Sequence, residues 1–363
     1  MKKGLFALLC GAIAFVSCEK DANLELDETL AVQEVKVDMS DFYVHTEDFD
    51  ERDGTAKAHG KNCYTMKVLN DRLASNPGLY QKMYNVEKHT RQFIASKKPD
   101  NPGGGNGGGG GGGGEEPPVE DNLGVITIPV VVHVLYNTAE QNISDQQINS
   151  QMAVLNDDFR AMNNDINQVP SLFEAVVADV EINFVLDQVI RKQTSRTSFG
   201  TNDAIKFDSQ GGSNVVTPET HLNMWVGVIG NNILGYAQFP GGSSATDGVV
   251  VDPRFFGTTG TATAPFDGGR TMTHEVGHWL NLRHIWGDGR CNRDDFVSDT
   301  PTSDRPNYGC PGFPTTHCRS TDMTMNYMDY VNDDCMYMFS AGQKERMRAL
   351  FGPGGARESI LAP

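Results

Sequence analysis

The sequence HEVGHWLNLRH, residues 274–284, places three histidines at spacings that suit a metal site. If this segment begins as a helix, His274 and His278 lie one turn apart on the same face, so their imidazoles can bind one cation. Glu275 lies beside them, where its carboxylate can take a proton from a water on the metal without being a ligand. The spacing therefore predicts a zinc site with Glu275 as the general base.

A third ligand requires a sharp turn after this helix. His284 reaches the same cation only if the helix ends near residue 281 and the chain turns back. A left-handed residue produces such a turn, for which glycine is the usual occupant and asparagine the next best tolerated. We therefore expect Asn281 to hold the turn and His284 to complete the ligand set. The alternative is a chance HExxH match whose histidines are ordinary core or surface residues.

These residues resemble a known signature. HEVGHWLNLRH is similar to the HExxHxxGxxH motif of metzincin metalloproteases, with Asn281 in place of the glycine, and MNYMDY (325–330) resembles their Met-turn. Within the metzincins the chain resembles the pappalysin family, and in particular its bacterial ulilysin-type members. This likeness is carried by HEVGHWL, by SDTP (298–301), by NYMDYVNDDCMYMFSAGQKERM (326–347) and by the cysteine spacing, and it covers about residues 123–351.

The resemblance implies a role for each residue of the site. The zinc ligands would be His274, His278 and His284. Glu275 would act as general base toward water and later as general acid toward the leaving amine. Met328 would support the site without binding zinc, and Tyr330 would stabilise the reacting carbonyl. A tyrosine that only packs beneath the site is the alternative for Tyr330.

The same resemblance extends to the loops after the motif. Asp333 would line the pocket just past the scissile bond and favour arginine or lysine on the carboxyl side of the cut. The disulfides would be Cys291–Cys318 and Cys310–Cys335, although the sequence alone allows three connectivities. Calcium would bind at Asp295 and Thr300. The alternatives are a solvated loop aspartate at 333 and an acidic loop without a metal at 291–301.

The N-terminus has the pattern of an exported protein. MKK precedes the apolar stretch GLFALLCGAIAFV, so residues 1–17 are predicted to be a signal peptide. FVSC resembles a lipobox, which makes Cys18 the lipidated first residue of a lipoprotein on the outer membrane or cell surface. The alternative is an ordinary signal peptide with an incidental cysteine.

A glycine run divides the rest of the chain. Residues 99–122 are rich in glycine and proline and are predicted to be a linker, whereas 18–98 form a propeptide-like segment with helical spacing in two parts, broken at Asn76-Pro77. Cys63 in this segment is a candidate latency thiol that occupies the open zinc position, with a bystander thiol as the alternative. Self-cleavage before Arg91, Lys97 or Lys98 would release the catalytic part from its anchor.

Residues 123–363 are predicted to form an α+β domain of the metzincin type. Strands are expected at 125–136, 180–187, 221–229, 234–240 and 248–255, and helices at 144–163, 269–282 and 340–351. This pattern predicts a mixed, mostly parallel sheet with a backing helix and an active-site helix in an N-terminal subdomain (123–284). An irregular, disulfide-tied C-terminal subdomain (285–363) follows.

Composition limits the possible functions. The formal net charge of −17 argues against nucleic acid as a partner and leaves the lipid anchor as the route to a membrane. We therefore expect a monomeric, surface-anchored or secreted zinc endopeptidase that acts on proteins or peptides and is made as a latent zymogen. A non-catalytic surface lipoprotein that keeps the fold for binding is the second hypothesis, and a zincin with a downstream glutamate ligand is the third.

Overall fold

The computed structural model of the chain describes residues 35–46, 63–97 and 121–362. The predicted signal peptide, the lipid anchor at Cys18 and nearly all of the predicted linker lie outside these residues. Within the described part, no helix is long and apolar enough to span a bilayer.

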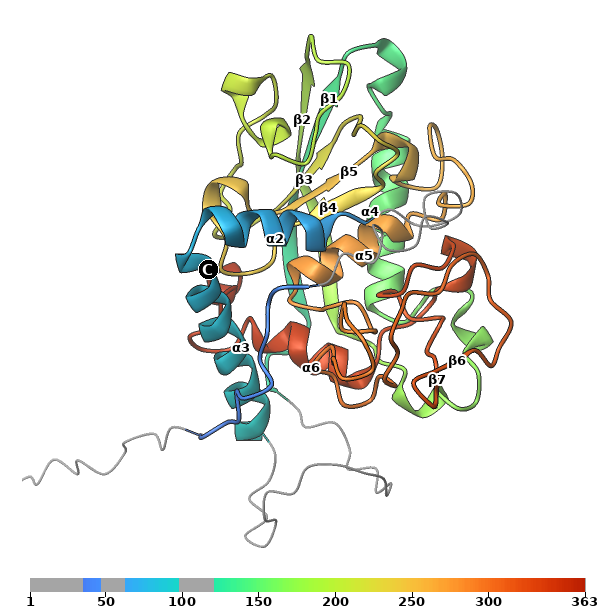
Figure 1. The fold of residues 1–363 in the computed structure, drawn as a ribbon. Coiled ribbons are helices and arrows are strands. Elements are labelled where there is room, and N and C mark those ends of the chain that lie inside the picture. Colours follow the sequence, from blue (N-terminus) through green and yellow to red (C-terminus); the bar gives the residue numbers. More distant parts are fainter. Residues whose placement is uncertain (1–34, 47–62, 98–120, 363) are drawn as a thin grey trace, which may run out of the picture. The chain divides into compact units, whose positions relative to one another are not determined.

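One five-stranded sheet forms the centre of the catalytic part (Figure 1). Its strands are β1 (Ile126–Tyr136), β2 (Ile182–Gln193), β3 (Leu222–Val226), β4 (Gly235–Ala237) and β5 (Val249–Val251). The order is β2-β1-β3-β5-β4, and all neighbours are parallel except β4 and β5. The prediction of a mixed, mostly parallel sheet is confirmed, and β4 lies at one edge.

Two helices pack beside the sheet, α4 (Asp145–Phe159) and α5 (Arg270–Trp279). Alternate residues of β1, from Ile126 to Val134, belong to the same apolar core as buried residues of these helices. Ser144 caps α4 by accepting a hydrogen bond from the Gln147 N–H at 3.1 Å. α4 ends at Phe159 instead of 163. β2 extends to Gln193 instead of 187, because it pairs with β1 along its full length.

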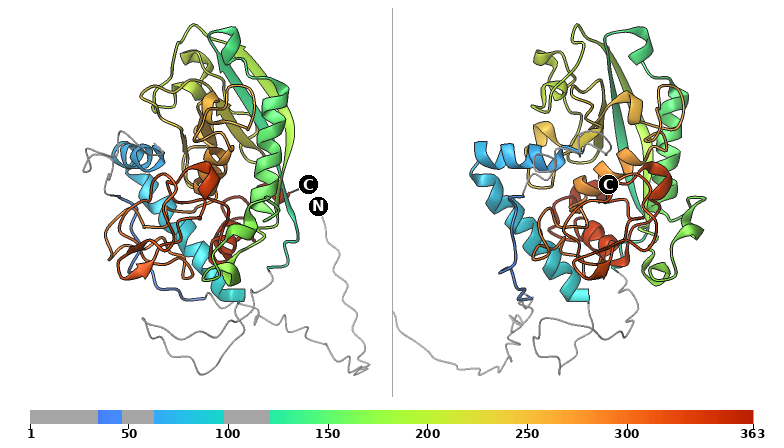
Figure 2. Two further views of the ribbon diagram at one scale, coloured as in Figure 1. Left: turned by 90° about the vertical axis from the view of Figure 1, so that its right-hand side faces the viewer. Right: turned by 45° about the vertical axis from the view of Figure 1, so that its right-hand side comes forward.

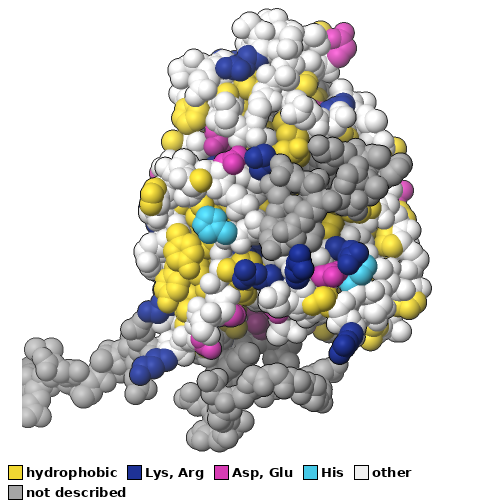
Figure 3. Space-filling model, viewed as in Figure 1, with side chains coloured by type: hydrophobic (Ala, Val, Ile, Leu, Met, Phe, Trp, Pro, Cys, Tyr) yellow, Lys and Arg dark blue, Asp and Glu magenta, His cyan; other side chains and the backbone are white. Residues whose placement is uncertain are grey.

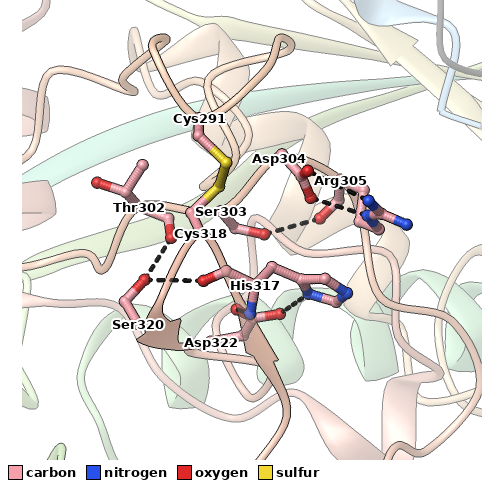
Figure 4. Close-up of a disulfide and its surroundings, with 9 residues drawn as sticks. All are labelled: Cys291, Thr302, Ser303, Asp304, Arg305, His317, Cys318, Ser320 and Asp322. Carbon is pink, nitrogen blue, oxygen red and sulfur yellow. Dashed lines mark hydrogen bonds and ion pairs between the residues drawn. A yellow bond between two sulfur atoms is a disulfide. The ribbon is translucent and has the colours of Figure 1, made fainter.

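The chain beyond α5 is irregular apart from α6 (Ala341–Ala349) and the short pair β6 (Thr316–His317) and β7 (Ser320–Thr321). Its two disulfides are Cys291–Cys318 and Cys310–Cys335, the pairings that the family resemblance implies. Figure 4 shows the first beside β6 and β7, where His317 contacts the buried Asp322 at 2.5 Å. Short 3-10 turns lie at Ala139–Gln141, Ile166–Gln168, Glu174–Val176, Ala204–Lys206, Asp208–Gln210, Ser244–Thr246, Pro253–Phe255, Asp333–Cys335 and Glu358–Leu361.

The N-terminal segment forms α2 (Thr65–Ser75) and α3 (Gly78–Lys97), with the break at Asn76-Pro77 as predicted. α2 crosses the edge strand β4, and α3 packs against α6 (Figures 1 and 2). A small apolar cluster joins the two helices to the catalytic part through Phe239. Tyr80 of α3 is an exposed hydrophobic side chain, and Figure 3 shows hydrophobic surface over this helix. The N-terminal segment therefore forms two helices that cover part of the catalytic domain.

Candidate active site

The turn after α5 has the conformation predicted from the sequence. Asn281 is left-handed, with φ of 70°. The Leu282 N–H donates to the Gly277 carbonyl at 2.9 Å, and the Asn281 N–H donates to the His278 carbonyl at 3.0 Å. These bonds close the helix and reverse the chain. As a result His284 lies beside the two histidines of the helix.

The three imidazoles are buried and point at one another. The Nε2 atom of His278 lies 3.2 Å from that of His274 and 3.1 Å from that of His284. Nitrogen ligands about 2.0–2.1 Å from a tetrahedral zinc ion lie about 3.3–3.4 Å apart. The observed separations therefore fit three ligands of one zinc ion.

Each imidazole is oriented through its other nitrogen. His274 Nδ1 contacts the Tyr327 carbonyl at 2.7 Å, and His278 Nδ1 contacts the Leu282 carbonyl at 2.8 Å. His284 Nδ1 contacts the carboxylate of Asp288. A carbonyl can only accept a hydrogen bond, so the proton of His274 and of His278 is on Nδ1 and the Nε2 lone pair is available to a metal. Sequence reasoning missed Asp288, although its position four residues after His284 was the available signal.

Cys63 supplies a fourth atom to the same point. Its thiol is buried, takes no part in a disulfide and lies 3.6 Å from His278 Nε2. A thiolate about 2.3 Å from zinc would lie about 3.6 Å from an imidazole ligand of that zinc. Burial and the nearby Glu275 carboxylate raise the pKa of the thiol well above 9.0. The described residues bring Cys63 and the three histidines together as one group with metal-binding spacing.

A second residue of the N-terminal segment contacts Glu275. The Thr65 hydroxyl donates to Glu275 Oε2 at 2.6 Å and accepts from the Ala237 N–H of β4 at 2.8 Å. The segment therefore makes an isolated parallel β-bridge to β4, with Cys63 opposite Gly235 and the Tyr64 N–H donating to the Gly235 carbonyl. Thr65 belongs to no recognisable motif, so this contact could not be predicted from the sequence.

The Met-turn lies directly beneath α5. A Cβ atom added at Gly277 would come within 2.4 Å of the Met328 sulfur, so the glycine inside HEVGH leaves the space that Met328 fills. Tyr330 packs against the rings of His274 and His284, and its hydroxyl donates to the Cys63 carbonyl at 3.3 Å. The phenol thus already contacts a peptide carbonyl close to the histidines.

Asp333 lies at the opposite end of α5 from the turn. It is buried, which shows that the alternative of a solvated loop aspartate is wrong. Its Oδ2 accepts hydrogen bonds from the Gly268 and Arg270 N–H groups at 2.9 and 3.1 Å. These bonds fix the carboxylate and satisfy amides at the start of the helix. Asp333 is therefore positioned by α5 as well as by its own turn.

The loop at 291–301 holds Asp295 and Thr300 together. The Thr300 hydroxyl contacts the two carboxylate oxygens of Asp295 at 2.8 and 2.9 Å, and the Val297 N–H donates to one of them. Burial and the carboxylate of Asp294 raise the pKa of Asp295 well above 3.8. Cys291, Cys318 and Asp304 also lie close together, but the two cysteines form a disulfide.

Comparison with known proteins identifies relatives of this arrangement. Residues 221–352 match the peptidase family described as pregnancy-associated plasma protein-A. An extracellular metalloprotease of Arthroderma gypseum is 30% identical over 236 residues, which cover 62% of this chain and 72% of the relative. Extracellular metalloprotease 1 of Coccidioides posadasii is 30% identical over 237 residues, covering 62% and 77%.

Solved structures of related proteins are similar to this chain in both sequence and fold. Mature mirolysin of Tannerella forsythia in complex with a cleaved peptide is 47% identical, with a TM-score of 0.64, and the match covers 66% of this chain and 96% of that one. A promirolysin mutant of the same organism is 40% identical, with a TM-score of 0.71 and coverage of 83% and 97%. With its sheet, its histidine cluster and these relatives, the chain belongs to the pappalysin family of metzincin metalloproteases.

Proposed function

We propose that the protein is a zinc-dependent endopeptidase in which His274, His278 and His284 bind the metal and Glu275 is the general base. The observation that supports this most directly is the geometry of the three Nε2 atoms, whose separations of 3.1 and 3.2 Å suit one tetrahedral ion. Zinc held there would acidify a water ligand and polarise the scissile carbonyl.

The residues around the histidines would carry the remaining steps. Glu275 takes a proton from the attacking water and returns it to the leaving amine. The Tyr330 hydroxyl donates a hydrogen bond to the oxygen that becomes negative on the scissile carbonyl. The edge strand β4 offers its backbone to an extended peptide, because the N-terminal segment already pairs there at Gly235.

A peptide library tests this proposal. The full chain, after processing, should cut peptides, whereas Glu275→Ala should lose at least about a thousandfold in kcat/KM because general base catalysis is removed. Zinc content should be unchanged in this variant, since Glu275 is not a ligand. Glu174→Ala, an exposed glutamate in a 3-10 turn, is the control. Equal cleavage by Glu275→Ala and wild type would contradict the assignment.

We propose further that Asp333 gives the enzyme its preference for arginine or lysine after the cut. Support comes from its buried carboxylate, which two backbone amides hold in place. Asp333→Asn keeps an oxygen acceptor for those amides but loses the charge. It should therefore retain the fold and lose about tenfold or more of the preference for basic over neutral peptides. Retention of the full preference would remove Asp333 from this role.

Latency is proposed to come from two contacts of the N-terminal segment. Cys63 fills the open metal position, and the Thr65 hydroxyl donates a hydrogen bond to the Glu275 carboxylate at 2.6 Å. Cys63→Ala should raise the activity of the unprocessed protein, and Thr65→Val, which keeps the shape but loses the hydroxyl, should raise it less. Thr90→Val is a control, because within the described part of the chain that hydroxyl donates to the Val86 carbonyl of its own helix. Unprocessed variants as inactive as wild type would refute the latency role.

Release of the segment is proposed to occur near the end of α3. Arg91 lies inside α3 and pairs with Glu87 at 2.8 Å and with Asp41 at 2.6 Å. A substrate enters the active site as an extended strand, and a residue held in a helix cannot do so. Lys97 is the last residue of α3, and Lys98 lies outside the described residues. We therefore favour cleavage before Lys97 or Lys98. Sequencing the N-terminus of the mature protein would check this, and a start at Arg91 would contradict it.

Calcium is proposed as a structural ion at Asp295 and Thr300. The support is a carboxylate that is 2% exposed and has a raised pKa, an environment in which a cation would offset the charge. Addition of calcium to chelator-treated protein should raise Tm, and Asp295→Asn should abolish that rise. An identical calcium response in the variant would place the ion elsewhere.

We propose a signal peptide (1–17), an N-terminal cover (18–98), a linker (99–122) and a catalytic domain (123–363) with subdomains at 123–284 and 285–363. The protein would be exported and anchored through lipid on Cys18, and its relatives' description as extracellular supports export. Metabolic labelling with a fatty acid, lost in Cys18→Ala, tests the anchor.

A further inference from the structure

One face of α2 contacts the catalytic part beyond the metal site. Tyr64, Val68 and Arg72 follow at intervals of four residues and therefore lie along one side of the helix. Val68 is 2% exposed and belongs to the apolar cluster that contains Ile205 and Tyr236, with Tyr64 packed against it. Cys63 and Thr65 point to the other side, toward the histidines and Glu275.

Arg72 ends this row at a polar site. Its guanidinium contacts Asp203 Oδ2 at 2.5 Å and donates to Gln238 Oε1 at 3.0 Å. Their side chains are 18% exposed for Arg72 and 14% for Asp203, so both lie mostly out of solvent. A guanidinium held by a carboxylate and an amide oxygen is a recognition arrangement for arginine.

The polar site is built by the catalytic part alone. The Lys206 ammonium is buried, lies 3.1 Å from Asp203 Oδ1 and donates to the Thr246 carbonyl at 2.6 Å. Burial raises the pKa of Asp203, but the neighbouring Lys206 and Arg72 cations outweigh this and hold the pKa below 3.8. The Thr246 hydroxyl and the Ser243 carbonyl fix Gln238 at 2.6 and 2.8 Å. Removal of α2 leaves these supports in place.

The position of the site along the cleft identifies the part of a substrate that would reach it. Asp333 binds the first residues of α5, whereas Gln238 lies near Asp247, which accepts a hydrogen bond from Trp279 at the last turn of α5. The two carboxylates, Asp333 and Asp203, therefore lie toward opposite ends of α5. If Asp333 receives the residue after the cut, Asp203 faces residues before it.

The spacing of alternate side chains in an extended peptide is close to the spacing of Val68 and Arg72 on α2. Alternate residues of a strand lie on the same face about 6.6–6.8 Å apart, and residues one turn apart on a helix such as Val68 and Arg72 are separated by about 6 Å. A substrate paired with β4 would place every second side chain on the face of Tyr236. One such side chain would lie at the Val68 position and the next at the Arg72 position.

We propose that Asp203 and Gln238 form a second substrate subsite, one that binds an arginine or lysine side chain on the amino side of the scissile bond and that Arg72 fills in the latent chain. The proposal rests on the proposed endopeptidase function. The enzyme would then recognise basic residues on both sides of the cut, one through Asp333 and one through Asp203.

Peptides that differ by one charge test the subsite. Arginine is placed in turn at the second, third and fourth positions before the cut, and citrulline, its neutral isostere, is the reference. For the processed enzyme, one of these positions should show kcat/KM at least about fivefold higher with arginine than with citrulline. Asp203→Asn should reduce that ratio to about one, whereas Asp208→Asn, whose carboxylate pairs with Lys192, should keep it.

A double variant and a binding measurement separate the possible outcomes. Asp203→Asn leaves Lys206 without its carboxylate, so Asp203→Asn/Lys206→Met is included in case the single variant unfolds. Binding of the same peptides to Glu275→Ala, after its linker has been cut by an added protease and its N-terminal segment removed, gives Kd values that do not depend on turnover. A charge preference in Kd without cleavage by wild type would uphold the subsite and overturn the proposed function. Equal kcat/KM and Kd for arginine and citrulline at every position would overturn the subsite and leave the function intact.

Discussion

Asn281 shows how one residue controls the geometry of the site. It holds φ of 70° in the turn that brings His284 to the other histidines, and its Nδ2 atom is buried without a hydrogen-bond partner among the described residues. Both features cost free energy relative to glycine. The site therefore uses a tolerated turn residue, not the one with the least strain.

Substitution at Asn281 should separate strain from function. Asn281→Gly should increase the free energy of unfolding by up to about 1 kcal/mol and keep zinc binding, whereas Asn281→Ala should lower it by about 1 kcal/mol and weaken zinc binding. Thermal unfolding and zinc titration measure both. Asn231→Ala is the control, because this exposed loop residue is also left-handed, with φ of 61°, but lies outside the histidine turn. Unchanged zinc affinity in Asn281→Ala would show that the turn does not position His284.

Gly277 is the second residue whose size determines the site. Gly277→Ala would bring a methyl group within 2.4 Å of the Met328 sulfur, so we expect a loss of about 1–3 kcal/mol in stability and a fall in activity. The pair Gly277→Ala/Met328→Ala should recover part of the stability, because the smaller side chain opens the space. Denaturant unfolding of the single and double variants provides the measurement. Additive losses would mean that the two residues do not interact.

At the scale of elements, α3 is attached to α6 by a buried ion pair. Arg346 contacts the two oxygens of Glu87 at 3.1 and 2.7 Å, and both side chains are nearly inaccessible to water. Burial alone would raise the pKa of Glu87, but the Arg346 cation, together with Arg91, outweighs it and lowers the pKa from 4.5 to about 2. The contact therefore favours the docked segment wherever Glu87 is ionised.

The ion pair gives docking of the segment a defined pH dependence. A carboxyl group whose pKa is lowered on docking contributes above its free value of 4.5, and this contribution is lost as the pH falls toward about 2. Glu87→Gln should weaken docking by about 3 kcal/mol at neutral pH, because Arg346 is left buried without its partner, and should flatten the dependence in that window. Co-elution of the nicked fragments against pH measures this. Asp71→Asn, in an exposed pair on α2, is the control, and an equal effect there would contradict the argument.

At the scale of the whole molecule, contacts distributed over its surface hold the N-terminal segment. The Cys63 bridge to Gly235 and the Arg72 contact with Gln238 lie at the two ends of β4, and the Glu87 pair lies at α6. A cut in the linker alone should therefore leave the fragments associated and the activity low. Activity should rise on dilution, as for any reversible complex. A fragment that leaves immediately at every concentration would contradict this expectation.

The sequence predicted more of the chemistry than of the packing. The histidine spacing, Asn281 and the strand β1 followed from local patterns, and the pairing of disulfides from the resemblance. The short β4 and the extended β2 did not, because their lengths depend on pairing with other strands. Thr65 and Asp203 could not be identified either, since each acts through a residue distant in sequence.

The burial of Cys63 also bears on how the disulfides form. After residue 18 the chain contains five cysteines, and two pairs join the loops of the C-terminal part. Four cysteines allow three connectivities, and a fifth reactive thiol increases the number of incorrect disulfides that can form during oxidative folding. Because Cys63 is only 4% exposed where it bridges to Gly235 of β4, it is withdrawn from thiol–disulfide exchange. A chain whose N-terminal segment docks early should reach its correct cross-links with fewer mispaired species than a chain that lacks the segment.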